Sequence, residues 1–406
     1  MPKLADRILC SGCSACYAIC GKRAITMNPD EEGFLRPHVD STICVECGAC
    51  EKACHVVTPY EERRPLEVYA ARATNNDIRF KSSSGGIFPL LARMQIRKGG
   101  VVYGVKWDKS GRIFHAEHDC ASTDEELEWF RGSKYVQSNI KDTYLKVKQQ
   151  LEAGDSVLFS GTPCQISGLK HFLKKDYSNL LCCDVICHGA PSPQIFQDYI
   201  ASMLPANTDG HEYFIKDIRF RDKNYENGGW RDGVVFLLEI IDRFNGEDRL
   251  IVRCKRTSVD PFLRGFLCEL INRPSCHNCT VRNLKSHSDI TLGDFWKIHK
   301  YAPQIDDNMG VSLICVNTEK GRKALSAIVP EMSDCIAFDW EAAIDSTGAL
   351  IESPKAHRNR KKFFSNYKRH GFNPNIIDKL LRPTIKERYR GLVRSIKAKI
   401  RPYIKR

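Results

Sequence analysis

The stretch Cys10-Ser-Gly-Cys-Ser-Ala-Cys-Tyr-Ala-Ile-Cys20 carries four cysteines in the pattern C-x2-C-x2-C-x3-C. The same pattern returns at an offset of 34 residues in Cys44-Val-Glu-Cys-Gly-Ala-Cys-Glu-Lys-Ala-Cys54. An internal repeat with identical spacing indicates two similar halves, each built around its own metal centre. Three closely spaced cysteines can wrap a tight loop around one 4Fe-4S cube, while the fourth reaches across to the cube of the other half. We therefore expect residues 1–60 to hold two 4Fe-4S clusters.

This crossing of the fourth cysteine assigns the ligands of both clusters. One cluster takes Cys10, Cys13, Cys16 and Cys54, and the other takes Cys44, Cys47, Cys50 and Cys20. Residues 24–27 and 34–39 flank a polar turn between the halves and predict a hairpin. The segment resembles a bacterial-type, two-cluster ferredoxin over residues 1–60, which implies an α+β ferredoxin domain. Gly21 and His55 follow the fourth cysteines, where that family usually has proline. A pair of zinc sites is the alternative, although zinc motifs pair CxxC units and do not run four cysteines together.

The cysteine content bears on the compartment. The chain has 406 residues and nineteen cysteines, an odd number that cannot be fully paired in disulfides. The first residues contain no apolar signal core, so reduced thiols acting as metal ligands are favoured over a disulfide scaffold. No apolar run approaches the length of a membrane span. We therefore expect a cytoplasmic protein of two or three domains.

The net charge of +13 is concentrated near the C-terminus. Residues 355–406 hold 18 Lys/Arg and 2 Asp/Glu, which leaves −3 for the rest of the chain. A basic body that binds nucleic acid is therefore not supported. In the predicted tail, residues 341–406, apolar side chains recur at helical spacing over 384–406 opposite Lys and Arg, which predicts a basic amphipathic helix. Three roles remain open for it: peripheral membrane contact, packing on the body, or docking to an acidic electron-transfer partner.

The body, residues 66–340, alternates between strand and helix patterns. Strands are predicted at 68–73, 101–107, 156–160 and 180–186, and helical segments at 87–98, 124–130, 140–153, 166–175 and 193–204. Such alternation predicts a mixed α/β fold with a largely parallel sheet. We divide the body into an N-terminal part, 66–150, and a C-terminal part, 151–340.

A loop of hydroxyls and glycines, Ser82-Ser-Ser-Gly-Gly86, precedes the helix predicted at 87–98. Backbone N–H groups and the helix dipole favour a phosphate at such a place. An ordinary helix cap is the competing interpretation. The chain contains neither G-x-G-x-x-G nor G-x-x-x-x-G-K-[ST], so a Rossmann nicotinamide site and a P-loop are disfavoured.

Four further cysteines suggest a third cluster. Cys164 and Cys187 follow two predicted strands, and the carboxyl ends of parallel strands share one crevice. Cys276 and Cys279 form a CxxC after Arg273-Pro274. We infer a third 4Fe-4S site from these four thiols. Two alternatives stay open: a zinc knuckle or redox pair at the CxxC, and a catalytic thiol at Cys164 on a helix N-terminus. His55 and His277 are expected to be solvent-facing neighbours of the cysteines.

The order of the motifs along the chain is more specific than any single motif. The double cysteine repeat is followed by Ser83-Ser-Gly-Gly86, Gly132-Ser-Lys-Tyr-Val-Gln-Ser138, Gly161-Thr-Pro-Cys-Gln165, Cys187-His-Gly189, the CxxC and Asp289-Ile-Thr-Leu-Gly-Asp-Phe-Trp296. This order resembles the family of beta subunits of coenzyme F420 hydrogenases and dehydrogenases over residues 1 to about 340. The resemblance implies a flavin-binding body that holds FAD beside a 4Fe-4S cluster.

Carried over to this sequence, the resemblance implies the FAD contacts. They are Ser83, Ser84, Gly85, Gly86, Lys134, Gly161, Thr162, Asp294 and Phe295. A cation at Lys134 would stabilise an anionic reduced flavin, whereas the plainer interpretation is a solvated surface lysine. Lys297 stands where a glycine is expected after the tryptophan. The polar segment 220–231 is either a substrate loop or an exposed hairpin.

These observations predict an iron–sulfur flavoprotein oxidoreductase. Its clusters and FAD would exchange electrons with a redox partner protein or subunit, and hydride with a small organic substrate or the deazaflavin coenzyme. No side chain is identified as the proton donor. Two other classes of protein remain: an electron-relay subunit without substrate chemistry, and an interaction module held together by zinc.

Overall fold

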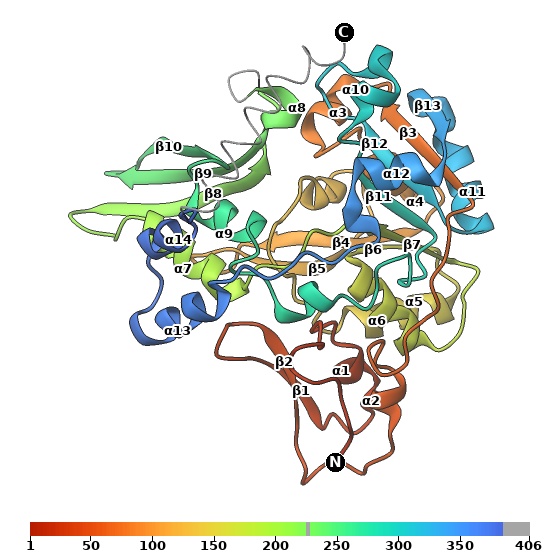
Figure 1. Cartoon of the computed structure of the whole chain (residues 1–406), viewed down its shortest axis with the longest axis horizontal. Helices are drawn as coiled ribbons and strands as arrows, with labels where there is room; N and C mark the ends of the chain where they lie inside the picture. Colours follow the sequence, from red (N-terminus) through yellow and green to blue (C-terminus); the bar gives the residue numbers. More distant parts are fainter. Residues whose placement is uncertain (225–227, 385–406) are drawn as a thin grey trace.

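A two-stranded hairpin, an eight-stranded mixed sheet and a three-stranded antiparallel sheet form the framework of residues 1–224 and 228–384, the parts of the chain that this computed structural model describes (Figure 1). The hairpin and its helices lie at one end of the molecule. The three-stranded sheet projects beside the eight-stranded one. Among the described residues, no helix is both long and apolar enough to cross a membrane.

The N-terminal module repeats its backbone as it repeats its cysteines. Its elements are α1 (Ala15–Ile19), β1 (Ile25–Pro29), β2 (Leu35–Val39) and α2 (Ala49–Lys52). β1 and β2 pair antiparallel, as the predicted hairpin requires. Ser14 and Gly48 occupy equivalent positions of the repeat, and both take left-handed backbone angles immediately before a helix, with φ of 65° and 70°. The two halves therefore turn their ligand loops into helices in the same way.

The eight-stranded sheet has a parallel centre and antiparallel flanks. From edge to edge its strands are β13 (Met332–Phe338), β3 (Glu67–Ala73), β12 (Ser312–Val316), β11 (Ile290–Asp294), β7 (Leu180–Val185), β6 (Val157–Gly161), β4 (Val101–Asp108) and β5 (His115–Ala121). Of these described strands, only the neighbours among β4, β6, β7 and β11 run parallel. The expectation of a largely parallel sheet is therefore correct only for the centre. β5 follows β4 through a short loop, and a parallel pair would need a longer crossover.

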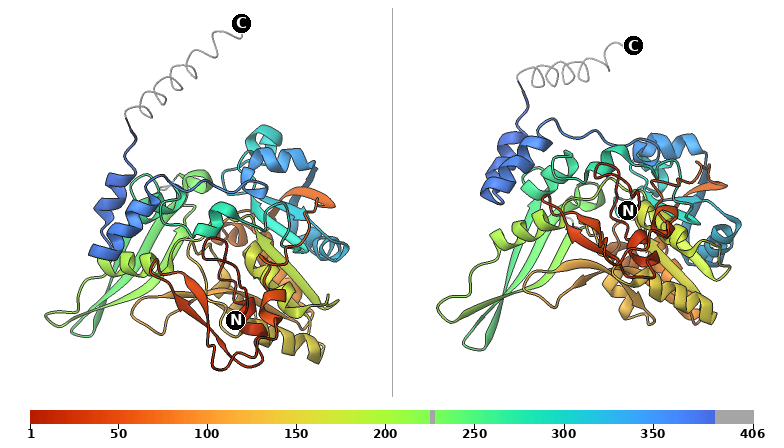
Figure 2. Two further views of the ribbon diagram at one scale, coloured as in Figure 1. Left: turned by 60° about the horizontal axis from the view of Figure 1, so that its bottom comes forward. Right: turned by 90° about the horizontal axis from the view of Figure 1, so that it is seen from below.

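Helices cover both faces of this sheet. The larger ones are α4 (Ile87–Arg97), α5 (Thr143–Ala153), α6 (Pro163–Leu173) and α11 (Glu319–Ile328). α4 and α11 bury one face in an apolar cluster, and α5 and α6 bury the other. Cys13 and Ala15 of the N-terminal module belong to the same cluster as α5 and α6. Figure 2 shows this module lying over those two helices.

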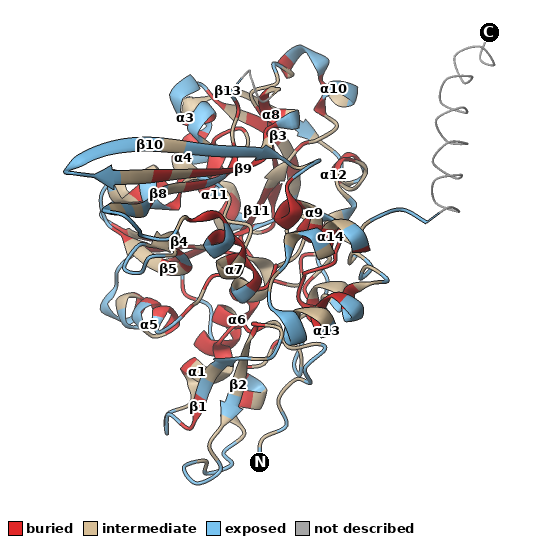
Figure 3. Cartoon of the chain, turned by 90° about the vertical axis from the view of Figure 1, so that its left-hand side faces the viewer, coloured by how far each residue is buried: buried red, intermediate tan, exposed pale blue. Residues whose placement is uncertain are grey.

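The three-stranded sheet builds a separate core. Its strands are β8 (His211–Arg221), β9 (Val234–Phe244) and β10 (Glu247–Arg256), and its helices are α7 (Pro193–Met203), α9 (Pro261–Leu267), α13 (Arg360–His370) and α14 (Pro374–Leu380). Phe363, Phe364 and Ile377 are buried in this core, so α13 and α14 are packed on the body rather than solvated. β10 is exposed along almost its whole length (Figure 3). The amphipathic helix predicted at 384–406 lies, apart from its first residue, outside the described residues.

Short elements complete the fold. They are α3 (Asn76–Lys81), α8 (Gly229–Asp232), α10 (Ile298–Tyr301) and α12 (Trp340–Ser346), with 3-10 turns at Glu126–Phe130, Pro274–Asn278, Pro303–Ile305, Val329–Glu331 and Gly348–Leu350. The turn at Pro274–Asn278 matters most for the site, because it carries the CxxC.

Candidate functional site

One set of cysteines lines a small cavity in the N-terminal module. The set consists of Cys10, Cys13, Cys16 and Cys54, and the cavity is closed by apolar residues such as Leu4 and Pro37. Cys54 comes from the second repeat, yet its charge acts on Cys13 and Cys16 of the first. The fold therefore brings together the four thiols that the crossing pattern assigns to one cluster. We call them the first set.

The second set, Cys20, Cys44, Cys47 and Cys50, lies nearer the surface. Cys50 interacts electrostatically with Cys20 and Cys47, and the backbone N–H of Ala24 donates to Cys20 Sγ over 3.3 Å. Cys47 is exposed. The neighbouring Val45 is 60% exposed, so this part of the module faces solvent.

The third set gathers Cys164, Cys187, Cys276 and Cys279 from three places in the chain. Cys164 lies in the first turn of α6, Cys187 follows β7, and the CxxC lies on the turn at Pro274–Asn278 and immediately after it. The charge of each of the other three thiols acts on Cys187. Ala190 N–H donates to Cys276 Sγ over 3.3 Å, and Thr162 Oγ1 lies 3.2 Å from Cys164 Sγ.

These sites suit iron–sulfur clusters better than hard cations. None of the nineteen cysteines, all of them in the described parts of the chain, forms a disulfide. Soft sulfur ligands in an apolar cavity select iron–sulfur clusters, zinc or copper(I). Burial raises the pKa of Cys276 to about 12, and the neighbouring Cys279 and Cys164 add to the shift. Loading the site must therefore displace protons. Within the described residues, no three His, Cys, Asp or Glu side chains are grouped to hold a single metal ion. A cube instead has its thiolates spread over separate irons.

The first and third sets are neighbours. The charge of Cys164 acts on Cys13, and both belong to the surroundings of the buried Tyr144. Tyr144 donates to the backbone oxygen of Gln165 over 2.7 Å, which ties α5 to the first turns of α6. The packing of the N-terminal module on α6 thus sets two cysteine groups side by side.

A much larger cavity of about 650 Å³ lies between the eight-stranded sheet and the three-stranded sheet. Its wall is rich in cations: Lys81, Lys106, Lys109, Arg131, Lys134, Arg219, Arg221 and Lys223, against the acidic Asp108, Glu128, Asp217 and Asp222. Trp107 and Trp129 add aromatic surface. A cavity of this size with a few convergent polar groups is typical of cofactor and substrate sites.

The serine–glycine loop presents only part of itself to this cavity. Ser83 lines the wall, and its Oγ lies 2.8 Å from Ser133 Oγ. Ser84 instead donates to Val311 O over 3.0 Å. Gly85 lies so close to β3 that a Cβ would stand 2.4 Å from Ala71 O, and Gly86 takes a φ of +89° as the cap of α4. Ser84, Gly85 and Gly86 therefore shape the loop, while Ser83 faces the cavity.

Lys134 lies in the cavity wall. Its Nζ donates to the backbone oxygens of Trp129 and Arg131 over 3.1 and 3.2 Å and lies 5.9 Å from the Trp107 ring. Burial lowers the pKa of Lys134 to about 8. A freely solvated surface lysine, the plainer interpretation of this residue, does not describe these contacts.

The remaining predicted flavin contacts lie outside the cavity wall. Gly161 ends β6, and Thr162 caps α6 together with Gln165, beside the third set. Asp294 accepts from Trp230 Nε1 over 2.9 Å and lies 3.8 Å from Arg221. Phe295 is fully buried in an apolar cluster, so the prediction that its side chain lines the crevice finds no support.

Sequence reasoning missed several residues of these sites. Arg221 and Lys223 come from the segment that sequence reasoning assigned to either a substrate loop or a hairpin; residues 220–223 line the cavity. Lys223 donates to Ser84 O over 2.7 Å, and burial lowers its pKa to about 7. The expectation of solvent-facing histidines is wrong: His55 is 2% exposed and lies 2.8 Å from Ser11 Oγ, and the side chain of His277 is 8% exposed.

The segment 132–138 links the two kinds of site. Gly132, Ser133 and Lys134 line the cavity. Three residues further along, Gln137 Nε2 donates to Ser11 O in the ligand loop of the first set over 3.1 Å. Ser138 Oγ accepts from Gln165 Nε2 over 2.9 Å, one residue beyond Cys164. One short piece of chain therefore contacts the cavity, the first set and the third set.

These features define an iron–sulfur electron-transfer protein of the oxidoreductase class, and the comparisons with known proteins agree. A 4Fe-4S dicluster domain matches residues 9–57. The N-terminal domain of the coenzyme F420 hydrogenase/dehydrogenase beta subunit matches residues 68–143, and the C-terminal domain of the same beta subunit matches residues 154–333. The chain belongs to this family of coenzyme F420 hydrogenase/dehydrogenase beta subunits.

Two known proteins are similar to this chain. The chain is similar to one of the subunits of the F(420)H(2) dehydrogenase of Methanosarcina mazei, with 24% identity over 177 residues, which is 40% of this chain and 49% of the relative. It thus spans about half the length of that curated relative. It also resembles a chain of the F420-reducing [NiFe] hydrogenase complex from Methanosarcina barkeri, with 16% identity, a TM-score of 0.43, and coverage of 76% of this chain and 91% of that chain.

Proposed function

We propose that this chain is an iron–sulfur flavoprotein subunit that connects a redox partner at its surface with an organic substrate at the large cavity. The packing of Cys13 of the first set against Gly168 of α6, the helix that carries Cys164 of the third set, supports this proposal. When bound, 4Fe-4S clusters exchange single electrons, and FAD can exchange single electrons as well as hydride.

The chain's own residues would order these sites from outside to inside. The second set, with Cys47 exposed, would face the partner. The first set lies behind it in the same module, and the third set lies behind the first, at the carboxyl ends of β6 and β7. Such an order keeps the inner sites away from water and leaves one side accessible.

The large cavity would hold FAD and the substrate. Ser83, Arg221 and Lys223 enclose one side of it, and Lys134 supplies a cation without a carboxylate hydrogen-bonded to its Nζ among the described contacts. A cation there would favour an anionic reduced flavin. Asp294 would act indirectly, because it lies outside the cavity wall, accepts a hydrogen bond from Trp230 and lies near Arg221 of the wall. The substrate is a small organic molecule or the deazaflavin coenzyme.

The composition of the holoprotein tests this proposal. After anaerobic purification, iron, acid-labile sulfide, zinc and flavin are counted on one sample; about twelve irons and one FAD per chain are expected. About eight irons without flavin would confine the redox chemistry to the N-terminal module. Stoichiometric zinc would favour the interaction module instead. With full loading, turnover of an artificial donor with candidate acceptors distinguishes an enzyme from an electron relay.

We also propose that the basic C-terminal helix contacts an anionic membrane surface. The sequence beyond Thr384 holds nine Lys/Arg residues and one acidic residue, Glu387. Each Lys or Arg near an anionic leaflet contributes about 1 kcal/mol. Removal of residues 385–406 should therefore abolish binding to anionic vesicles.

A further inference from the structure

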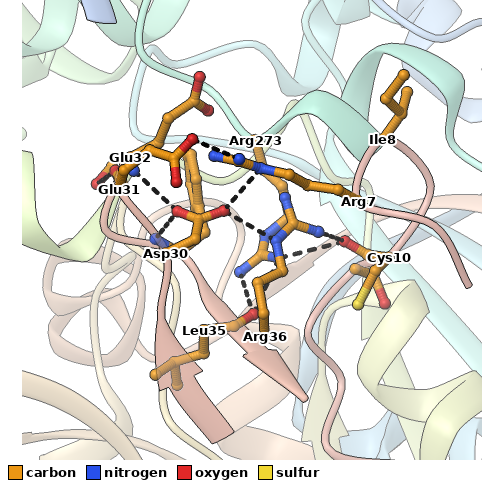
Figure 4. Close-up of polar contacts among 12 residues, drawn as sticks. Arg7, Ile8, Cys10, Asp30, Glu31, Glu32, Leu35, Arg36 and Arg273 are labelled. Carbon is orange, nitrogen blue, oxygen red and sulfur yellow. Dashed lines mark hydrogen bonds and ion pairs between the residues drawn. The ribbon is translucent and has the colours of Figure 1, made fainter. Parts of the chain in front are cut away.

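Arg273 is a buried cation between two cysteine sets. It lies three residues before Cys276 and is 1% exposed. Its Nη1 donates to the backbone oxygens of Cys10 over 3.2 Å and Leu35 over 3.3 Å (Figure 4). Its Nη2 donates to Gln137 Oε1. One guanidinium thus contacts the ligand loop of the first set while its backbone leads into the third.

The absence of a side chain at Gly12 leaves space for this guanidinium. Gly12, inside the ligand loop, has a φ of +67°, and a Cβ there would stand 2.8 Å from Arg273 Nη2 and 2.7 Å from Leu35 O. The guanidinium carbon lies 4.7 Å from the centre of the Phe34 ring. Arg273 Nε has no hydrogen-bond partner among the residues that the structure describes. The contacts therefore position the group without neutralising its charge.

Arg273 has no carboxylate within ion-pair distance in the described parts of the chain. Its neighbour Arg36 makes a useful contrast, because Arg36 donates to the same Cys10 oxygen over 2.6 Å and also pairs with Asp30 at 3.0 Å (Figure 4). An isolated buried charge is unfavourable unless an opposite charge compensates it. Burial and the neighbouring Arg36 lower the pKa of Arg273, whereas negative charge at Cys10, Cys276 and Cys164 raises it.

We propose that Arg273 is the shared counter-ion of the first and third sets and raises their reduction potentials relative to the exposed second set. This inference rests on the proposed function, since it requires clusters at these cysteines. Reduction adds negative charge, which a fixed nearby cation stabilises. Arginine suits this role because it stays protonated at all working pH values. Electrons arriving from a partner would then be held at the inner sites.

Anaerobic redox titration of the full-length holoprotein, followed by electron paramagnetic resonance, tests this inference. In R273Q, we expect the reduced-to-oxidised ratio of the inner clusters at a fixed potential to fall at least about tenfold, which is about 59 mV for a one-electron couple. The signal of the second set should stay in place. R273K keeps the charge and loses the planar fork, so its inner potentials should remain close to wild type.

A charge-neutral control addresses the bond to Cys10. The double variant R36Q/D30N removes a shorter hydrogen bond to the same oxygen and leaves the net charge unchanged, so little shift is expected. Gln137→Glu places a carboxylate against Arg273 with almost no change of shape, so it should lower the inner potentials even with the arginine present. If R273Q binds less iron than wild type, Q137E becomes the deciding test of the charge effect, because this variant keeps Arg273.

The outcomes separate this inference from the proposed function. A wild-type protein without twelve irons would contradict the proposed function. A fully loaded protein in which R273Q and Q137E both leave the inner potentials unchanged would overturn the role of Arg273 alone. Equal shifts in R273K and R273Q would assign the effect to the fork and not to the charge, and would overturn it as well.

Discussion

Gly168 of α6 lies directly against Cys13: a Cβ at Gly168 would stand 2.9 Å from Cys13 Sγ. Gly168 follows Cys164 by one helical turn, so the same helix carries a ligand of the third set and receives a ligand of the first. The absence of a side chain at this position lets the N-terminal module approach α6. The distance between the two cysteine sets therefore depends on one glycine.

Gly168→Ala should loosen this contact. Alanine normally stabilises a helix interior relative to glycine, but overpacking here should cost about 1–3 kcal/mol. We expect a lower unfolding midpoint and partial loss of the first cluster's iron, measured by thermal unfolding and iron content of the same preparation. Gly348→Ala, at a site where a Cβ meets nothing within 4 Å, is the matched control. A stabilised G168A with full iron would contradict the close packing.

Cys164→Ser should remove one cluster without emptying the cavity. The variant retains the cap of α6 formed by Thr162 and Gln165, so the fold should persist. We expect the iron of one cluster to be lost, flavin content to remain, and reduction of the flavin through the N-terminal module to slow by at least about tenfold. The exposed Cys268→Ser should leave all three quantities unchanged. Because a serine oxygen can replace a thiolate on a cluster iron, C164A is measured beside it, and retention of twelve irons in both variants would exclude Cys164 as a ligand.

Lys134 should make the reduction potential of the bound flavin dependent on pH. Burial lowers its pKa from 10.5 to about 8, so its charge is lost as the pH rises through 8. An anionic reduced flavin should therefore be stabilised less above pH 8, seen as a more negative flavin potential. K134R keeps the cation over this range, so the change in flavin potential near pH 8 should disappear. K134M has no cation at this position, so its flavin potential should be the more negative one at every pH.

The same lowered pKa predicts the direction of a stability change. Between about pH 8 and pH 10.5 the unfolded chain binds more protons at Lys134 than the folded chain. The free energy of unfolding contributed by this residue therefore rises with pH in that window and is lowest below it. The difference in stability between wild type and K134M, followed by denaturant titration, should narrow as the pH rises. A constant difference from pH 7 to 10.5 would refute this assignment.

Removal of residues 385–406 should abolish binding to vesicles of anionic lipid. The cut leaves α13 and α14 intact, so unfolding of the body should be unchanged. Sedimentation with anionic vesicles is compared with sedimentation with neutral vesicles, at low and high salt, because screening weakens the attraction. Equal partitioning of the full and shortened chains would rule out the membrane role.

The spacing of residues in the sequence predicted much of the fold. The four-cysteine repeat specified the N-terminal module, because ligand loops, helix starts and the hairpin all lie within a few residues of one another. The elements expected at α4, α5, α6 and α7 occur where the alternating patterns place them, within a few residues at their ends. The crossing of Cys20 and Cys54 followed from the same short spacing.

Tertiary structure determined the strand pairings, burial and long-range contacts that residue spacing could not predict. The antiparallel flanks of the large sheet depend on strand pairings between distant segments, such as β3 with β12 and β13. Phe295, predicted to contact FAD, belongs to a core cluster, whereas Arg221, from the segment predicted as either a substrate loop or a hairpin, lines the cavity. Arg273 meets Cys10 across 263 residues of chain. No periodicity encodes such a contact, because it arises only when two separately folded segments bury their surfaces against each other.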